Sequence, residues 1–516
     1  MKAKPKRQHR PNVPARLRNN AISGTKRAGL LICSFLFCWQ SISAADLLWQ
    51  FDSEAKKIHR LVLNLQTEQA YQQLRYYKGN ALHKMYVQSF CETLDVLISE
   101  DEEKFNQIET LFRERFKQLE GMPESAETLF LRAELNLQRG FNFLNLGQEF
   151  NAVWAIRNAF NLTQECLKKY PAFVPIKKTS GVIQVMVGSV PDKYHWFITL
   201  LGMKGSVAVG QSQLEELRKS GSSLNIEATI LYYTIKGLIN QQIEESTQGF
   251  MEALKEEPTN RLLLFLAINM LMKNGQSEEA LKQVETLHAH PQGLPMYYIE
   301  YLHGEMLLQK GRYTDAIVAY QHFIQHYRSD NFKKDAYYKI SLAYWLMNKK
   351  ELAKVNFERA KVTGRNVAEP DRYADAQLKE GLFPNPKILK VRLATDGGYY
   401  QQAREVLQSI TPADLVTLKE KTEYYYRKAR LAHRTADLAA ARLFYQQTID
   451  MAGDNPWYFA PNAALQLGYL AQAQRDPASA RKYFNLALSY KKHEYKNSID
   501  SKARSALDQL KTTSST

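Results

Sequence analysis

The chain has 516 residues, of which 45% are hydrophobic and 24% are charged. This apolar content can fill a large core and excludes a largely disordered chain. The net charge of +16 is concentrated at the start, because residues 1–45 carry nine Lys or Arg and no Asp or Glu. The remainder holds 60 basic and 53 acidic residues, which is an ordinary solvated surface and argues against nucleic acid as a partner.

Residues 1–45 have the pattern of a secretory signal peptide. A basic stretch precedes ten mainly apolar residues, 30–39, which is half of the roughly 20 that a membrane-spanning helix needs. Ser43 and Ala45 place small residues at the −3 and −1 positions before Asp46. We therefore expect export to the periplasm or cell envelope, with an uncleaved membrane anchor or an organelle transit peptide as alternatives.

The region 46–171 is predicted to be helical but irregular, because helical periodicity recurs without period-two alternation. Long helices are expected over 127–146 and 149–170. Cys91 and Cys166 are the cysteines that remain after the leader, and their spacing matches neither a disulfide framework nor a zinc site. We expect small buried hydrophobic side chains at both positions, with a single disulfide as the alternative.

Residues 172–223 are rich in Gly and Val and are expected to form a helical insertion. Gly202, Gly205 and Gly210 suggest a phosphate-binding loop at first sight. No Gly-Lys-Ser/Thr follows them and no parallel strand is predicted before them, so the lysine and the metal-binding hydroxyl of such a loop are missing. Close helix packing or a turn is the better explanation.

Five alanines between residues 280 and 480 stand at one fixed place in a helical pair. Each follows a short turn and precedes a larger side chain by four residues, and successive alanines are separated by 36, 37 and 39 residues where the series is unbroken. A period in the thirties with constant register indicates a helix–turn–helix repeat, whose units bury their apolar faces by stacking. The alanines are Ala280, Ala316, Ala353, Ala441 and Ala480.

Residues 297–330 resemble a tetratricopeptide repeat. Gly304 and Ala316 occupy the eighth and twentieth positions, where two helices cross too closely for a large side chain, and Tyr320 occupies the bulky twenty-fourth position. Phe323 departs from the small residue expected at position 27. We therefore predict an all-α fold, a tetratricopeptide-like α-solenoid of stacked antiparallel helix pairs over 224–510, followed by a polar tail at 511–516. The same register recurs at Ser341, Ala353 and Phe357, and at Gly468, Ala480 and Phe484.

A second, narrower resemblance covers the Gly/Val-rich segment and the C-terminal end. The chain is similar to tetratricopeptide repeat protein 39 and the fungal inclusion-body lipid mobilisation protein, which implies handling of lipid or an envelope component through residues 181–210. The secretory signal departs from this family, whose eukaryotic members are intracellular. The matching residues are Ser189, Pro191, 196–201, Gly202, Gly205, Gly210 and Leu214, then Ala487, Leu488, Tyr490, Tyr495 and 505–507.

Tyrosines and arginines recur at the helix positions that line the concave groove of tetratricopeptide arrays. Positions 5 and 9 of a helix are i, i+4 neighbours, so their side chains project together. Tyr and Arg offer broad rigid area and forked donors, which suits an extended peptide or an anionic terminus. The alternative is that the tyrosines pack between repeats. The candidate groove residues are Tyr301, Tyr338, Tyr426, Arg392, Arg430, His433 and Arg434.

The histidine pairs of the chain do not form a recognisable catalytic or metal motif. His288 and His290 lack further ligands with suitable spacing, and His322 and His326 lack the intervening glutamate of a zinc protease. We therefore predict no catalytic residue, no cofactor and no metal. The predicted function is a non-catalytic scaffold that binds a protein or peptide partner. A lipid or envelope-component protein, and a solenoid-containing cell-wall enzyme, are the alternatives.

Overall fold

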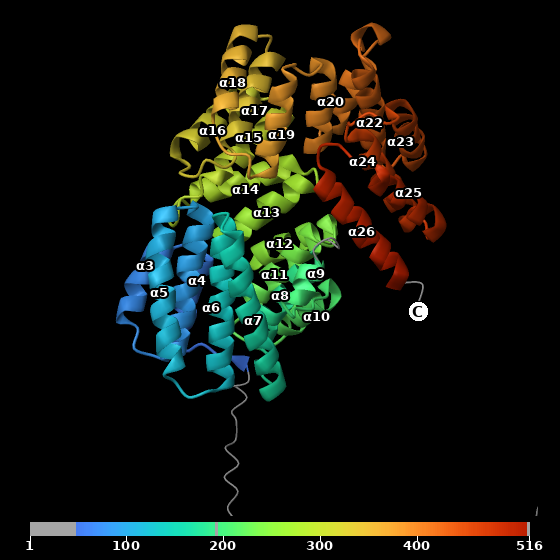
Figure 1. The fold of residues 1–516 in the computed structure, drawn as a ribbon. Helices are drawn as coiled ribbons and strands as arrows, with labels where there is room; N and C mark the ends of the chain where they lie inside the picture. Colours follow the sequence, from blue (N-terminus) through green and yellow to red (C-terminus); the bar gives the residue numbers. More distant parts are fainter. Residues whose placement is uncertain (1–47, 191–194, 513–516) are drawn as a thin grey trace, which may run out of the picture. The chain divides into compact units, whose positions relative to one another are not determined.

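A computed structural model of the chain describes residues 48–190 and 195–512 (Figure 1). The predicted signal peptide and the last four residues of the predicted tail lie outside these ranges. Within them the chain is built of α-helices and one short 3-10 turn, η2 (Pro412–Asp414), and contains no β-strand. The predicted all-α fold of stacked antiparallel helix pairs is confirmed.

Nine helix pairs of the described chain share one kind of turn. In each turn the residue two places before the second helix has a φ between 55° and 86°, which is the left-handed conformation that ends many helices. This turn occurs in the N-terminal region as well as among the predicted repeats, so one structural unit recurs along the chain. The turn residues are Leu65, Gly147, Gln241, Gly275, Gly311, Asn348, Gly398, Ala436 and Arg475.

The two helices of each pair lie side by side, and from α11 onward successive pairs pack against one another. The pairs are α2 (Ser53–Leu63) with α3 (Thr67–Tyr76), α6 (Ala126–Asn145) with α7 (Glu149–Lys169), α11 (Asn225–Leu238) with α12 (Ile243–Glu256), α13 (Arg261–Lys273) with α14 (Ser277–Ala289), α15 (Tyr298–Lys310) with α16 (Tyr313–His326), α17 (Lys333–Leu346) with α18 (Lys350–Val362), α20 (Pro386–Gly397) with α21 (Tyr400–Gln408), α22 (Leu418–Arg434) with α23 (Leu438–Ala452), and α24 (Phe459–Ala473) with α25 (Pro477–Ser489).

Seven further helices stand between or after these pairs. The long helices predicted over 127–146 and 149–170 are found as α6 and α7, each within one residue of the expected bounds. The loop predicted around 363–386 contains α19, which packs against α17 and α18. The remaining helices are α4 (Ala81–Ser99), α5 (Glu102–Glu120), α8 (Ile176–Gly188), α9 (His195–Leu200), α10 (Val207–Arg218), α19 (Glu369–Glu380) and α26 (Lys496–Thr512).

The glycines of the 172–223 segment allow two helices to touch. A Cβ atom on Gly210 of α10 would lie 2.4 Å from the carbonyl oxygen of Gly181 in α8, which is closer than any side chain permits. Gly202 has a φ of +72° and lies in the turn after α9. Helix packing and a turn therefore explain these glycines, as the sequence predicts.

Within the repeat pairs, an aromatic ring covers the glycine of the facing helix. A Cβ atom on Gly468 would lie 2.4 Å from the ring of Phe484, and one on Gly304 would lie 2.9 Å from the ring of Tyr320. The small residue at position 8 therefore makes room for the bulky residue at position 24. The two helices therefore come closest where the glycine at position 8 meets the ring at position 24. The sequence predicts instead that they come closest between the two small residues, at positions 8 and 20.

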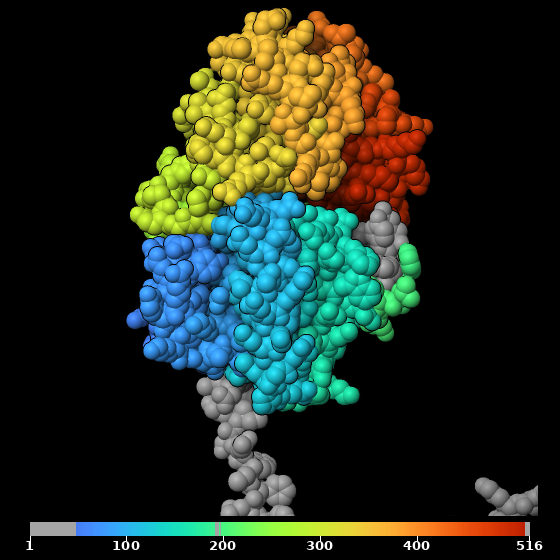
Figure 2. All heavy atoms as spheres, turned by 60° about the vertical axis from the view of Figure 1, so that its left-hand side comes forward, coloured from blue at the N-terminus to red at the C-terminus, as the bar shows by residue number. Residues whose placement is uncertain are grey.

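Segments far apart in the sequence meet across this unit. The α2–α3 turn joins the repeats through the backbone amide of Leu294, which donates to the carbonyl oxygen of Leu65 at 2.7 Å. Arg328 pairs with Asp101, and in Figure 2 the light-blue surface near residue 100 adjoins the yellow surface near residue 330. One hydrophobic core consequently runs from the first helices into the repeats.

Cys91 and Cys166 are both buried and free, so the expectation of small buried side chains is confirmed and the alternative of a disulfide is wrong. Burial raises the pKa of each thiol to about 12.

Candidate functional site

A cavity of about 1380 Å³ lies among the first helices of the repeat pairs. Each of these helices contributes residues at i, i+4 spacing, such as Tyr301, Glu305 and Gln309 on α15. Such spacing means that one continuous face of each helix borders the cavity. Helices α15, α17, α20, α22 and α24 supply nearly half of the lining residues, and the α11–α12 junction, the end of α13, α19 and α26 supply most of the rest.

Six of the seven candidate groove residues line this one cavity. They come from α15, α20 and α22, which lie more than 130 residues apart in the sequence at their extremes. Tyr338 is the exception: it is 1% exposed, and its ring packs 6.3 Å from that of Phe357. The face of α17 that borders the cavity carries Asp335 and Lys339, and Tyr338 does not line it. The six are Tyr301, Arg392, Tyr426, Arg430, His433 and Arg434.

The two candidate tyrosines at the cavity are held mainly by packing. Tyr301 is 4% exposed, and its hydroxyl donates to Oδ2 of Asp335 at 2.6 Å. Tyr426 is 3% exposed, with its ring 5.5 Å from that of Phe459. These contacts fit the alternative interpretation that the tyrosines pack between repeats, so the arginines are the stronger binding candidates.

One wall of the cavity contains a lysine between two carboxylates. Lys339 pairs with Glu305 and lies 3.8 Å from Oδ2 of Asp335. Burial raises the pKa of Asp335 to about 6, although the Lys339 charge opposes this. For Glu305 burial also acts to raise the pKa, but the Lys339 charge outweighs it and the pKa is lowered. The Lys339 charge therefore offsets part of the negative charge on this wall.

Another part of the wall, at the end of α22, carries cations with weaker pairing. Arg430 lies 3.9 Å from Oδ1 of Asp396, at the limit of an ion pair, and Arg434 Nη2 donates to the carbonyl oxygen of Lys273 at 3.4 Å. Burial, together with the charges of Arg430 and Arg434, lowers the pKa of His433 to about 4, so this imidazole is neutral at pH 7. The wall is consequently an electropositive surface.

A chain of tyrosine rings fixes the C-terminal helix against the repeats. The rings of Tyr373 and Tyr495 stack at 5.3 Å, and Tyr495 meets Tyr458 edge-on at 5.2 Å. Arg392 Nη1 donates to the Tyr373 hydroxyl at 2.9 Å, and Arg427 Nη2 donates to that of Tyr458 at 2.7 Å. These contacts place α26 at the cavity and explain why its residues take part in the wall.

Sequence reasoning missed four cations of the wall, which are Lys273, Lys339, Arg427 and Lys502. Lys273 is the last residue of α13, and Lys502 lies on α26, beyond the last predicted helix pair. The signal for Lys339 was its i, i+4 spacing from Asp335. The positions of Lys273 and Lys502 depend on contacts between distant segments, which no local pattern shows.

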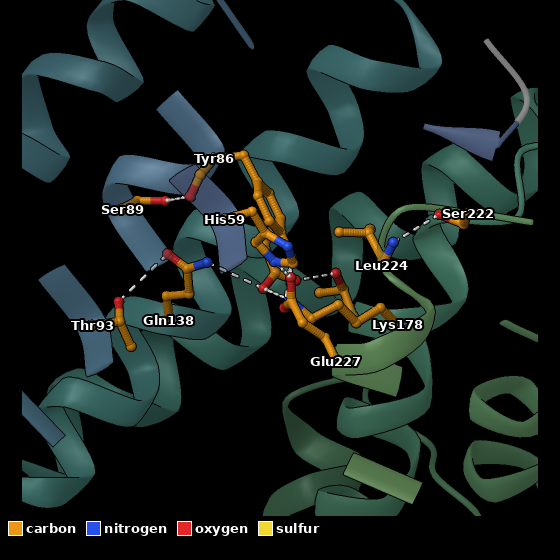
Figure 3. A network of polar contacts seen from close by, with 11 residues as sticks. His59, Tyr86, Ser89, Thr93, Gln138, Lys178, Ser222, Leu224 and Glu227 are labelled. Carbon is orange, nitrogen blue, oxygen red and sulfur yellow. Dashed lines mark hydrogen bonds and ion pairs between the residues drawn. The ribbon is translucent and has the colours of Figure 1, made fainter. Parts of the chain in front are cut away.

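A second polar cluster, in the N-terminal half, is fully buried (Figure 3). Lys178 Nζ lies 2.6 Å from both Glu134 Oε1 and Glu227 Oε2, and His59 Nε2 lies 2.7 Å from Glu227 Oε1. The Tyr86 hydroxyl donates to Glu227 Oε2 at 2.8 Å. Burial acts to raise the pKa of Glu227, but Lys178 and then His59 outweigh it and lower the pKa to about 2.

This cluster is a structural ion network. Lys178 is 4% exposed and Glu227 is 3% exposed, and each makes several charge-assisted contacts. Buried charges persist when they are paired and hydrogen-bonded in this way. We assign the network to holding α2, α4, α6, α8 and α11 together.

The histidines near residues 288 and 322 gather around one carboxylate. Glu300 accepts a hydrogen bond from His288 Nε2 at 2.8 Å and lies 3.7 Å from His303 Nδ1 and 3.8 Å from His322 Nδ1. Burial acts to raise the pKa of Glu300, and the histidines outweigh it, lowering the pKa to about 2. In the part of the chain that the structure describes, no group of three or more His, Cys, Asp or Glu side chains is arranged to hold a metal ion.

Of the segment 181–210, expected as a lipid-contact surface, the part in α8 is internal, whereas Trp196, Leu200 and Val209 are exposed. Val182, Ile183, Val185 and Val187 are buried with Tyr232 in a small core of their own. Among the described helices, none is long and apolar enough to cross a membrane.

The family comparison matches one unit of the array. Residues 334–361, which cover α17 and α18, match the tetratricopeptide repeat. This unit therefore matches the tetratricopeptide repeat, in agreement with the register predicted around Ala353. No curated protein matches the chain. The resemblance to tetratricopeptide repeat protein 39 therefore gains no support and stays a prediction.

Solved structures with similar helical folds cover most of the chain. The human IFIT1 dimer with PPP-AAAA is 13% identical, covers 92% of this chain and 97% of its own, and has a TM-score of 0.30. The APC/C hetero-tetramer Cut9–Hcn1 is 12% identical, covers 91% of this chain and 99% of its own, and has a TM-score of 0.27. The likeness lies in the helical fold only.

Proposed function

We propose that this chain is an exported, non-catalytic scaffold that binds a protein or peptide partner in the cavity. The observation that carries the proposal is the shared cavity face of α15, α17, α20, α22 and α24, which brings arginines from different repeats to one surface. A repeat array presents such a surface over several units at once, which suits an extended partner.

The size and chemistry of the cavity favour a chain segment over a small molecule. Small-molecule pockets have roughly 300–1,000 Å³ and mainly apolar walls. Here the volume is about 1380 Å³, and the wall is dominated by Arg, Lys, Tyr, Asn and Gln. Tyr and Arg are enriched among the residues that dominate binding energy at protein interfaces. A peptide offers backbone donors and acceptors that match such a wall.

The proposed export depends on residues 1–45 alone. Their basic stretch, short apolar run and small residues before Asp46 support a cleaved signal peptide. Cell fractionation and N-terminal sequencing of the isolated protein test this part: a chain that begins at Asp46 in the envelope fraction supports export, and an intact cytoplasmic chain contradicts it.

The binding part is tested by a crosslinking pull-down from the envelope fraction. Arg430→Ala with Arg434→Ala removes two cavity arginines, and Arg359→Ala with Arg404→Ala removes two exposed arginines outside the cavity. We expect the cavity pair to weaken partner capture about ten-fold or more while the melting temperature stays nearly unchanged. The control pair should capture the partner as wild type does. A large fall in stability would show that the cavity arginines are structural.

A further inference from the structure

We propose that Lys273, Arg430, Arg434 and Lys502 form a subsite for an oxyanion, a carboxylate or a phosphate, carried by the bound peptide. This inference rests on the proposed function and adds the chemical character of the partner. The four side chains come from three helices, α13, α22 and α26, and all four line the cavity. Like charges repel one another, so a cluster of cations at a cavity wall is unfavourable unless an anion binds there.

The geometry of the cluster is set by α22. Arg430 and Arg434 are i, i+4 neighbours on this helix, so both project toward the cavity. Arg434 Nη2 reaches the carbonyl oxygen of Lys273 at 3.4 Å, which brings the end of α13 to the end of α22. Lys502 lies on α26, whose place at the cavity is fixed by the tyrosine chain through Tyr495.

The cations of this cluster have few carboxylate partners. Within residues 48–190 and 195–512, Lys273, Arg434 and Lys502 have no ion pair within 4.0 Å, and Arg430 has only the 3.9 Å contact to Asp396. Outside the cluster, the cavity cations Lys339 and Arg427 pair with Glu305 and with Glu423, the latter at 2.7 Å. Arg392 has no ion pair among the described residues and donates to the Tyr373 hydroxyl. Most of the cavity cations that lack a close carboxylate therefore lie in this cluster.

For two of the four cations, Arg434 and Lys502, other charges of the cluster disfavour the charged form. Burial, followed by the charge of Lys273, lowers the pKa of Lys502. Burial and the charge of Arg430 lower the pKa of Arg434. An anion placed among these groups would replace repulsion by charge-assisted hydrogen bonds.

Helix ends account for only part of the cluster. Lys273 and Arg434 are the last residues of α13 and α22, where a cation interacts favourably with the carbonyl end of the helix. Arg430 lies one turn inside α22, and Lys502 lies in the middle third of α26. The helix dipole does not stabilise a cation at these two positions, because its effect falls off within the last turn. An anionic ligand would stabilise all four cations.

The surrounding charges favour a peptide with one anionic group over a nucleic acid. Acidic side chains also border the cavity, at Glu244, Glu245, Glu369 and Asp396. A polyanion would meet these carboxylates along its length, because nucleic-acid backbones carry a charge at every step. A peptide places one carboxylate or phosphate at the cluster and leaves the remaining wall to neutral or basic groups.

The test uses the purified full chain and an array of random heptapeptides. Each peptide is made with a free C-terminal carboxylate, with a C-terminal amide, and with an amide plus one phosphoserine. Binding of the best peptides is then measured by fluorescence anisotropy for wild type, for Lys273→Gln with Lys502→Gln, and for a control. The control, Lys349→Gln with Lys354→Gln, removes the same charge from exposed positions outside the cavity.

We expect the carboxylate or phosphoserine form to bind wild type about ten-fold or more tightly than the amide form, as charge-assisted hydrogen bonds require. The double variant should lose this preference, and the control should keep it. If the carboxylate form binds wild type more tightly than the amide form, the oxyanion is a carboxylate. If the phosphoserine form does so, the oxyanion is a phosphate. Where the double variant does not fold, Lys502→Gln alone gives the same comparison.

Three results would overturn the proposal in distinguishable ways. Equal binding of the three peptide forms, or a double variant that keeps the preference, removes the subsite and leaves the proposed function standing. Absence of any peptide binding removes the proposed function and the subsite together. A single-stranded RNA oligomer that binds more tightly than every peptide, and depends on Lys273 and Lys502, replaces the peptide by a nucleic acid.

Discussion

Lys178 is buried and Lys502 is partly buried, but the charged groups around these two lysines differ. Lys178 lies 2.6 Å from each of two glutamates, in a network that joins helices of the N-terminal half. Lys502 faces a large cavity, and its charged neighbours are Lys273, Arg430 and one carboxylate, Glu369, with which it forms no ion pair within 4.0 Å. The first arrangement satisfies its charges within the chain, and the second leaves them available. The comparison distinguishes cations that stabilise the fold through ion pairs from cations that we propose bind a ligand.

The largest effect should follow from breaking the buried network. Lys178→Met removes the partner of Glu134 and Glu227 and leaves two carboxylates in the interior, so we expect a loss of about 3–5 kcal/mol in the free energy of unfolding. Urea denaturation measures this loss. The neighbouring Lys177 pairs with Glu216 at the surface, and Lys177→Met should cost no more than about 1 kcal/mol. Equal losses in the two variants would contradict the structural assignment of the network.

The two regions should also respond to pH in opposite directions. The pKa of Glu227 is lowered to about 2, so its contribution to stability is present above about 4.5 and is lost as the pH falls toward 2. The pKa of Asp335 is raised to about 6, so its contribution is present below about 4 and is lost as the pH rises toward 6.

Each pH effect should amount to about 2–3 kcal/mol at most, since one pKa unit corresponds to about 1.4 kcal/mol. Denaturation of wild type, Glu227→Gln and Asp335→Asn at pH 3 to 7 measures both. The deficit of Glu227→Gln relative to wild type should shrink as the pH falls, and the stability of Asp335→Asn relative to wild type should improve as the pH rises from 4 to 6. Parallel curves for the three proteins would contradict the assignment.

A smaller effect should follow from crowding the helices that build the cavity wall. Gly468→Ala would place a methyl group 2.4 Å from the ring of Phe484, so we expect a loss of about 1–3 kcal/mol in thermal or urea denaturation. Gly121 ends α5 with a φ of −81° and has 3.5 Å of space, so Gly121→Ala should be nearly neutral. A neutral Gly468→Ala would show that the α24–α25 contact is looser than described.

The smallest stability effect should come from the same kind of change in the cavity. Lys502→Met removes a half-buried cation that has no ion pair within the described residues, so we expect a change within about 0.5 kcal/mol, or a slight gain. Urea denaturation beside Lys178→Met makes the contrast direct. A loss near that of Lys178→Met would mean that Lys502 holds the fold and is not reserved for a ligand.

Much of the architecture could be predicted from local patterns. The spacing of Gly304, Ala316 and Tyr320 predicts how two helices pack within one repeat. The recurrence of this spacing predicts that successive repeats stack on one another. The left-handed turn that the nine helix pairs share could be predicted from the sequence only where glycine occupies it, as at Gly311. At Ala436 and Arg475 the same left-handed conformation is imposed by the flanking helices, and their identity gives no sign of it.

The candidate site was only partly predictable. Arg430 and Arg434 follow from the helix positions that border a groove, and the cavity contains them. Tyr338 follows from the same rule but is buried, and the residues of α17 that line the cavity are Asp335 and Lys339. Lys273 and Lys502 reach the cavity through contacts with segments that are distant in sequence, which depend on how the units stack.

The central claim, that a partner binds inside the array, is tested most directly by a photo-crosslinking amino acid placed at two sites in the producing cell. One replaces Tyr469, which lines the cavity, and the other replaces Tyr76 on α3, which is 80% exposed and lies outside it. We predict that the Tyr469 position captures one protein through a single segment, and that a peptide of that segment abolishes the crosslink. Capture of the same partner from the Tyr76 position only, or equally from both positions, would contradict the account.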